Sequence, residues 1–167
     1  GIGKSRLVEE ARSLAGEAEV AVVTAAGLPV ERNIAYRAFR PVAETLLGLD
    51  PTWPAERRAA AALTAIETHP DLAALAPLIN SIVPLGLAEN DHTRGLVGEK
   101  RVFRTDDLLC GLLQQRCSNH RVLLVVEDAH WLDSTSWRVL RRVQAEVRPL
   151  ALLIATRPMP TDPPEEV

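Results

Sequence analysis

The chain opens with Gly1-Ile2-Gly3-Lys4-Ser5, and this stretch is the strongest indication of its fold. A complete phosphate-binding loop has the pattern G-x-x-x-x-G-K-[ST] and follows directly on a buried strand. Gly3-Lys4-Ser5 match the end of that pattern, whereas its opening glycine would fall three residues before residue 1. We therefore expect a nucleotide-binding protein, present here as a fragment that lacks the strand before the loop.

The residue types at this position suit phosphate. Glycine lets backbone N–H groups approach phosphate oxygens closely, and the N-terminus of the following helix adds partial positive charge. Lys4 is expected to neutralise the β- and γ-phosphates, and Ser5 to offer its hydroxyl to Mg²⁺. A glycine-rich turn before a helix that merely includes a lysine is the alternative, so the interpretation needs support from elsewhere in the chain.

Composition and charge are those of a single globular domain. The 167 residues are 47% hydrophobic and 25% charged, with a net charge of -3 that lacks the basic footprint of a nucleic-acid-binding domain. No apolar run reaches the roughly 18 residues of a membrane span, and no signal peptide is recognisable, so we expect a cytoplasmic protein. Cys110 and Cys117 have no second close pair, which favours two small apolar helix side chains over a metal site or disulfide.

Hydrophobic periodicity predicts strands that alternate with helices. The first helix should follow Ser5 and end near Gly16, with Leu7, Val8 and Leu14 on its apolar face and Arg12 on the other. Strands are predicted at 20–25, 122–126 and 150–155, further helices at 35–47, 56–67, 71–78, 99–117 and 134–147, and a loop at 84–98. The last two strands are continuously apolar, as strands covered on both faces are. The order of elements is typical of a parallel α/β domain.

Two of these strands end in polar groups. The strand at 122–126 runs into Glu127-Asp128, where one acid can hold Mg²⁺ and its neighbour can polarise the attacking water. Capping of the next helix is the alternative, and the Gly-Lys-Ser helix start makes it the less favoured one. The strand at 150–155 ends in Thr156-Arg157, and a guanidinium there is suited to sensing a γ-phosphate. Surface arginines at strand ends are common, so Arg157 supports a nucleotide site only together with the Gly-Lys-Ser turn and the acidic pair that precede it in the chain.

Three stretches resemble one family, in the same order along the chain. Gly1 to Glu10 resembles the P-loop of the AAA-like ATPase modules in LuxR-type regulators and multidomain adenylate/guanylate cyclases. Glu127-Asp128-Ala129-His130-Trp131-Leu132-Asp133-Ser134 resembles their Walker B stretch, and Asn33 to Phe39 the segment after their second strand. The resemblance covers nearly the whole chain. It implies an α/β fold, a three-layer P-loop NTPase (ASCE, AAA-like) core with a parallel sheet whose first strand is missing.

The same resemblance implies an ATP-dependent switch of the STAND class, with ATP and Mg²⁺ as cofactors. The expected nucleotide-binding residues are Gly1, Gly3, Lys4, Ser5 and Arg6. The expected metal ligands are Ser5, Glu127 and Asp128, and the expected catalytic residues are Glu127, Asp128 and Arg157. The order Glu-Asp departs from the usual Asp-Asp or Asp-Glu, so either acid can be the one that serves Mg²⁺. His130 is expected to make a structural hydrogen bond near the acids rather than to act as a general base.

Two functions follow from this sequence. The first is an ATP-binding, slowly hydrolysing module of a signalling or transcription-regulatory protein, whose partners are ATP or ADP, other domains of the parent chain and another copy of itself. The alternative is a degenerate scaffold that no longer binds nucleotide. Residues 1–157 are expected to form the domain, incomplete at its N-terminus, and 158–167 a Pro-rich tail or cut linker. A missing central strand would expose apolar edges, so we expect this chain to fold poorly and to bind ATP weakly.

DNA and membranes are not expected partners of this segment. In LuxR-type relatives the helix-turn-helix that binds DNA lies in a separate C-terminal domain, which this sequence does not include. The sequence also contains no basic recognition helix of its own.

Overall fold

The structure, a computed structural model, describes residues 2–158. Its elements in chain order are α1 (Ile2–Glu17), β1 (Ala21–Ala26), the 3-10 helices η1 (Pro29–Glu31) and η2 (Arg37–Phe39), α2 (Arg40–Leu46), α3 (Ala55–Glu67), α4 (Pro70–Ala73), the 3-10 helix η3 (Ala76–Ser81), α5 (Gly98–Asn119), β2 (Val122–Glu127), the 3-10 helix η4 (Ala129–Trp131), α6 (Ser134–Glu146) and β3 (Ala151–Ile154). None of the helices within this part of the chain has the length and apolar character needed to cross a lipid bilayer.

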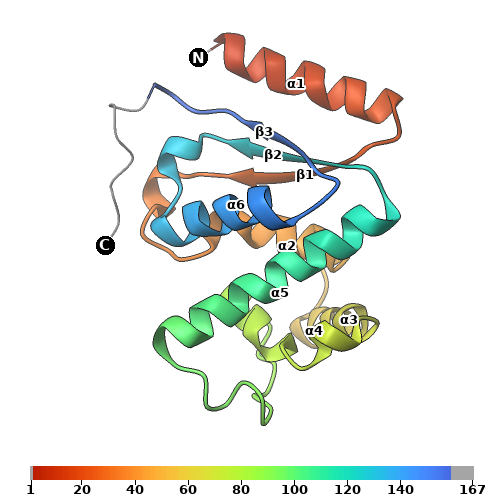
Figure 1. Cartoon of the computed structure of the whole chain (residues 1–167), viewed down its shortest axis with the longest axis vertical. Coiled ribbons are helices and arrows are strands. Elements are labelled where there is room, and N and C mark those ends of the chain that lie inside the picture. Colours follow the sequence, from red (N-terminus) through yellow and green to blue (C-terminus); the bar gives the residue numbers. More distant parts are fainter. Residues whose placement is uncertain (1, 159–167) are drawn as a thin grey trace.

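The three strands form one parallel sheet in the order β1-β2-β3. Parallel neighbours need long crossovers, and here the helical segment up to α5 joins β1 to β2 while α6 joins β2 to β3. Figure 1 shows α1 on one side of the sheet and α2, α5 and α6 on the other. The predicted α/β class, parallel sheet and layered core are therefore confirmed.

The main core lies between the sheet and the helices on the α5 side. Along β1, Val23 and Ala25 are buried on that side, whereas Thr24 between them faces α1. Three leucines of α5 are fully buried, and so are the side chains of Phe39 and Ile66. Both cysteines are free and buried on α5, as the sequence predicts.

The face that α1 turns to the sheet differs from the predicted one. Val8 and Ala15 are buried, but Leu7 and Leu14 are 70% and 56% exposed. Arg12, expected on the solvent side, instead reaches the sheet and bonds to side chains of β1 and β2. The polar contacts of Arg12 therefore set the rotation of α1, which a ranking by hydrophobicity alone does not capture.

The other two differences concern β3 and the predicted helix at 35–47. β3 is an edge strand that bonds to β2 alone among residues 2–158, and its side chains are exposed or half-exposed rather than covered on both faces, with Ile154 at 39%. Tyr36 adopts a left-handed φ of 62°, so the helical segment begins after it, at residue 37. The segment therefore forms the turn before η2, η2 itself and the short α2.

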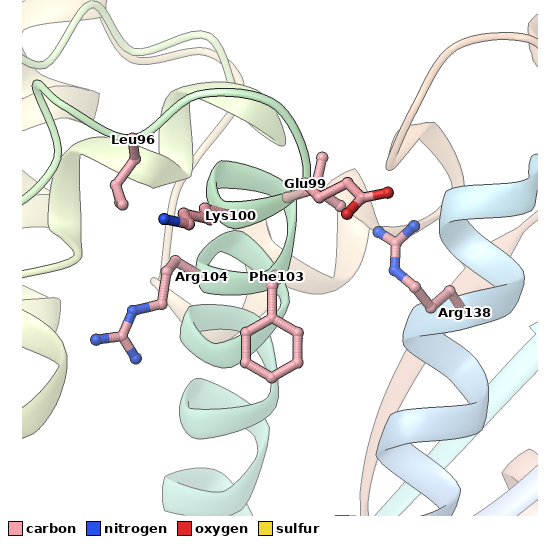
Figure 2. A pocket seen from close by; sticks show the side chains of 7 residues that line it. Leu96, Glu99, Lys100, Phe103, Arg104 and Arg138 are labelled. Atoms are coloured by element: carbon pink, nitrogen blue, oxygen red, sulfur yellow. The ribbon is translucent and has the colours of Figure 1, made fainter.

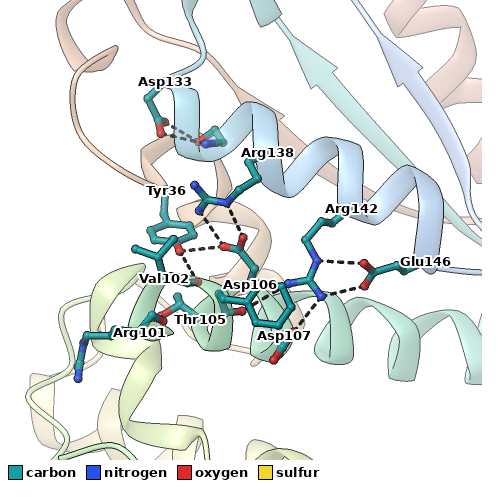
Figure 3. Close-up of polar contacts among 12 residues, drawn as sticks. Tyr36, Arg101, Val102, Thr105, Asp106, Asp107, Asp133, Arg138, Arg142 and Glu146 are labelled. Atoms are coloured by element: carbon teal, nitrogen blue, oxygen red, sulfur yellow. Dashed lines mark hydrogen bonds and ion pairs between the residues drawn. The ribbon is translucent and has the colours of Figure 1, made fainter. Parts of the chain in front are cut away.

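An ion pair between a buried carboxylate and a partly exposed guanidinium fixes α6 to α5, and Tyr36 joins it from the segment after β1 (Figure 3). Asp106 of α5 is fully buried and accepts hydrogen bonds from Nε and Nη2 of Arg138, at 2.8 and 3.2 Å. The hydroxyl of Tyr36 donates to the same carboxylate at 2.8 Å. Burial and the neighbouring Asp106 raise the pKa of Tyr36.

Candidate functional site

A small cavity lies at the carboxyl ends of β2 and β3, next to the first turn of α1. Its volume is about 100 Å³, and its lining consists of Lys4, Ser5, Val8, Glu127, Asp128, Ala155 and Arg157. Five predicted site residues, drawn from three separate segments of the chain, thus surround one space. The carboxyl ends of parallel strands are where ligands bind in open α/β sheets. The volume fits a few phosphate groups but is smaller than pockets that enclose a whole drug-sized ligand.

The first turn of α1 supplies the basic side of this cavity. Because α1 begins at Ile2, Gly3-Lys4-Ser5 are helical, and the first N–H groups of the helix have no partner within it. A Cβ placed on Gly3 would meet nothing within 4 Å, so the space above this turn is open. The turn therefore offers backbone donors, an ammonium group and a hydroxyl to an anion.

The acidic side is a strained turn after β2. Asp128 has left-handed angles, φ 47° and ψ 45°, and its side chain is exposed. The N–H of Gly27 donates to the carbonyl of Glu127 at 2.9 Å, and the N–H of Ala129 to the carbonyl of Ala155 at 3.0 Å. Backbone bonds to the neighbouring strand ends therefore keep Asp128 in a conformation that non-glycine residues seldom adopt.

Gly27 is required by this turn. A Cβ at position 27 would lie 2.5 Å from the carbonyl oxygen of Asp128 and 3.0 Å from Trp131. Such contacts are too close for any side chain. The loop after β1 thus supports the acidic turn by direct backbone approach.

Glu127 has a partner that the sequence interpretation missed. Nη2 of Arg12 donates to Oε1 of Glu127 at 2.5 Å and to Oγ1 of Thr24 at 3.2 Å. Arg12 follows Lys4 and Val8 at four-residue intervals, so all three lie on one face of α1. The available sequence signal was this four-residue spacing, which places Arg12 on the same helix face as Lys4 and Val8. Both of those residues line the cavity.

The structure does not bring Arg6 or His130 into this lining. Arg6 is exposed on α1 and does not line the cavity, and Gly1 lies outside the described residues. Both ring nitrogens of His130 are buried and have no hydrogen-bond partner in residues 2–158, so its predicted structural hydrogen bond is not formed there. Its ring packs against Trp131 with centroids 4.9 Å apart.

A larger cavity, of about 750 Å³, lies where the start of α5 faces α6 (Figure 2). Phe103, Lys100 and Arg104 of α5 line it together with Arg138 of α6. It contains none of the predicted site residues. Its lining also includes Glu99, so it is a mixed apolar and charged surface, and it lacks the Lys-Ser pair and the acidic strand end that line the smaller cavity.

The donor set of the small cavity fits a nucleotide-bound Mg²⁺. Mg²⁺ usually takes one or two carboxylates and fills its other positions with substrate phosphates and water. Glu127, Asp128 and the hydroxyl of Ser5 are present in the lining. Within residues 2–158 no group of three or more His, Cys, Asp or Glu side chains could hold a metal ion by itself. The chain's own residues therefore suit a metal that is shared with phosphate.

Comparison with known protein families places most of the chain in one of them. The model of a family described as the AAA ATPase domain matches residues 1–154. No curated protein and no solved structure matches the chain.

Proposed function

Because the chain belongs to the AAA ATPase domain family, we propose that it is an ATP-binding switch module with slow Mg²⁺-dependent ATPase activity. The observation that carries this proposal is the single cavity in which Lys4, Ser5, Glu127, Asp128 and Arg157 meet. Three segments far apart in sequence contribute to it, and each contributes the group that phosphoryl transfer needs from that position.

The reaction is attack of water on the γ-phosphate, which yields ADP and phosphate. Lys4 and the N–H groups of α1 bind the phosphate oxygens, while Ser5 and Glu127 hold Mg²⁺. When bound, Mg²⁺ neutralises charge on the β- and γ-phosphates. Asp128 orients the attacking water and accepts its proton, and Arg157 contacts the γ-phosphate.

The assignment of the two acids rests on their placement. Glu127 is the last residue of β2, and its carboxylate faces α1, the helix that carries Ser5. Asp128 is on the exposed turn beyond the strand. Glu127 is therefore the better placed acid for Mg²⁺, and Asp128 for water.

The wider role is a further part of the proposal. The stretch from Glu127 to Ser134 resembles the Walker B region of LuxR-type regulators and multidomain cyclases, which favours a STAND-like module in a larger signalling or transcription-regulatory protein. ATP and Mg²⁺ are supplied in the cytoplasm, so the module is proposed to act there. The exposed Leu7 and Leu14 of α1 favour contact with another domain of the parent chain or another copy.

Phosphate release from ATP tests the catalytic part. The intact chain should release phosphate slowly with Mg²⁺ and not in EDTA, and Glu127→Gln and Asp128→Asn should each reduce the rate by about 10²-fold or more. Arg58→Gln is the matched control, because it breaks the ion pair to Glu44 away from the cavity. If the unaltered chain binds no ATP, the proposed ATPase activity is contradicted and the degenerate scaffold is favoured.

A further inference from the structure

We propose that Arg12 is a positioning residue for the metal site: it holds Glu127 by one carboxylate oxygen and leaves the other to face Mg²⁺. This inference rests on the proposed function and deepens it. It assigns a role to a residue that lies outside the phosphate-loop pattern and outside the cavity lining.

The geometry of α1 carries the first step. Lys4, Val8 and Arg12 are four residues apart, so one face of the helix presents them in turn. Lys4 and Val8 line the cavity, and Val8 is only 4% exposed. The guanidinium of Arg12 therefore reaches Glu127 from behind the cavity, one turn of helix deeper than Val8.

The hydrogen bonds carry the second step. The contact with Arg12 occupies Oε1 of Glu127, and the same Nη2 also donates to the hydroxyl of Thr24. Thr24 belongs to β1 and lies opposite Val125 of β2 in the sheet register. The guanidinium is thus anchored to two adjacent strands, which fixes the direction in which Glu127 presents its second oxygen, Oε2.

Burial carries the third step. The side chains of Arg12 and Glu127 are 33% and 34% exposed, and Nε of Arg12 is buried with no partner in residues 2–158. An arginine that was only a solvated side chain on the helix surface would not pack its guanidinium against a sheet.

Binding of Mn²⁺, used in place of Mg²⁺, tests the inference without measuring activity. Electron paramagnetic resonance counts free Mn²⁺ in the presence of the full chain and a non-hydrolysable ATP analogue. Arg12→Gln should weaken Mn²⁺ binding by about 10- to 100-fold, as loss of a residue that orients a metal ligand does. Affinity for the same analogue in EDTA should stay unchanged, because Lys4 and the helix N-terminus are intact.

Two further variants separate positioning from folding. Arg12→Lys keeps the charge but offers a flexible point donor, so it should recover part of the Mn²⁺ affinity. Thr24→Val removes only the second anchor and should weaken Mn²⁺ binding less than Arg12→Gln does. These two variants give the test if Arg12→Gln does not fold, and Arg58→Gln controls for loss of an ion pair elsewhere.

The outcomes are distinguishable. If the unaltered chain binds the analogue and Mn²⁺ but Arg12→Gln binds Mn²⁺ equally well or more tightly, the role of Arg12 is overturned and the proposed function stands. If the unaltered chain binds neither, the proposed function fails and the role of Arg12 fails with it.

Discussion

At the scale of single residues, two substitutions of Asp128 distinguish the loss of its carboxylate from an increase in backbone strain. Its left-handed conformation is one that Asn tolerates and Ala does not. Asp128→Asn should therefore leave the free energy of unfolding nearly unchanged while removing phosphate release. Asp128→Ala should lose the activity and about 1 kcal/mol of stability as well. Urea unfolding measures the stability of the two variants, and a phosphate-release assay measures their activity. Equal stability of the two variants would contradict the strain argument.

Gly27 should be intolerant of any side chain, because its Cα lies against the acidic turn. Gly27→Ala would force a methyl group to 2.5 Å from the carbonyl oxygen of Asp128. We expect a loss of about 1–3 kcal/mol, the usual cost of overpacking a filled site, together with weaker activity from the displaced turn. Gly16→Ala is the control, since a Cβ there meets nothing within 4 Å. Similar melting temperatures for both variants would rule out this close approach.

Most residues that line the candidate cavity could be named from the sequence, because the patterns that single them out are local. Gly-Lys-Ser and an acidic pair after an apolar strand are short patterns with a fixed position relative to a helix or strand. Arg12 was not, because its role depends on a carboxylate 115 residues away. The strained turn at Asp128 was not predictable either, since nothing in the pair Glu127-Asp128 specifies a left-handed backbone.

At the scale of elements, α6 owes its start to Asp133. The carboxylate accepts from the N–H of Ser136 at 2.9 Å and from its hydroxyl at 2.5 Å, and Asp133 is 8% exposed. Asp133→Ala should cost about 0.5–2 kcal/mol, the range for loss of an N-cap. The next residue, Ser134, is exposed and is the first residue of α6 rather than its cap, so Ser134→Ala should change little. Chemical denaturation of both variants decides between the two caps, and a larger loss for Ser134→Ala would contradict the assignment.

The buried thiol of α5 predicts sensitivity to alkaline pH. Burial raises the pKa of Cys110 from 9.0 to about 12. Above pH 9 the unfolded chain loses this proton while the folded chain keeps it, so the free energy of unfolding falls as pH rises toward 12. Cys110→Ala should flatten this decline, measured as the slope of unfolding free energy against pH from urea titrations. An unchanged slope would show that other groups, such as Tyr36, dominate it.

Predictability differs among the elements for a physical reason. β2, α3 and α5 have long apolar or periodic patterns, and the structure places them within about two residues of the predicted bounds. The predicted helix at 35–47 is confirmed over residues 37–46, as η2 followed directly by α2, and it begins two residues late because Tyr36 has a left-handed backbone. The prediction that β3 is covered on both faces was wrong, because the apolar composition of a strand does not reveal which layers cover it.

At the scale of the whole molecule, the layered arrangement makes the site. The sheet brings the ends of β2 and β3 together, α1 crosses one face with its first turn over those ends, and α6 is fixed to α5 on the other face (Figure 1). The order of elements predicted this arrangement, because parallel strands joined by helices end at the same edge. The rotation of α1 depends on tertiary contacts alone.

Calorimetric titration of ATP with Mg²⁺ into this chain and into Lys4→Ala tests the nucleotide site most directly. Lys4 is in the first turn of α1, half-exposed beside the cavity, so its replacement should leave the fold intact. We predict measurable heat of binding for the unaltered chain and a loss of affinity of about tenfold or more for Lys4→Ala, the value of a charge-assisted contact to phosphate. No binding by the unaltered chain, or equal binding by both, would contradict a nucleotide site in this cavity.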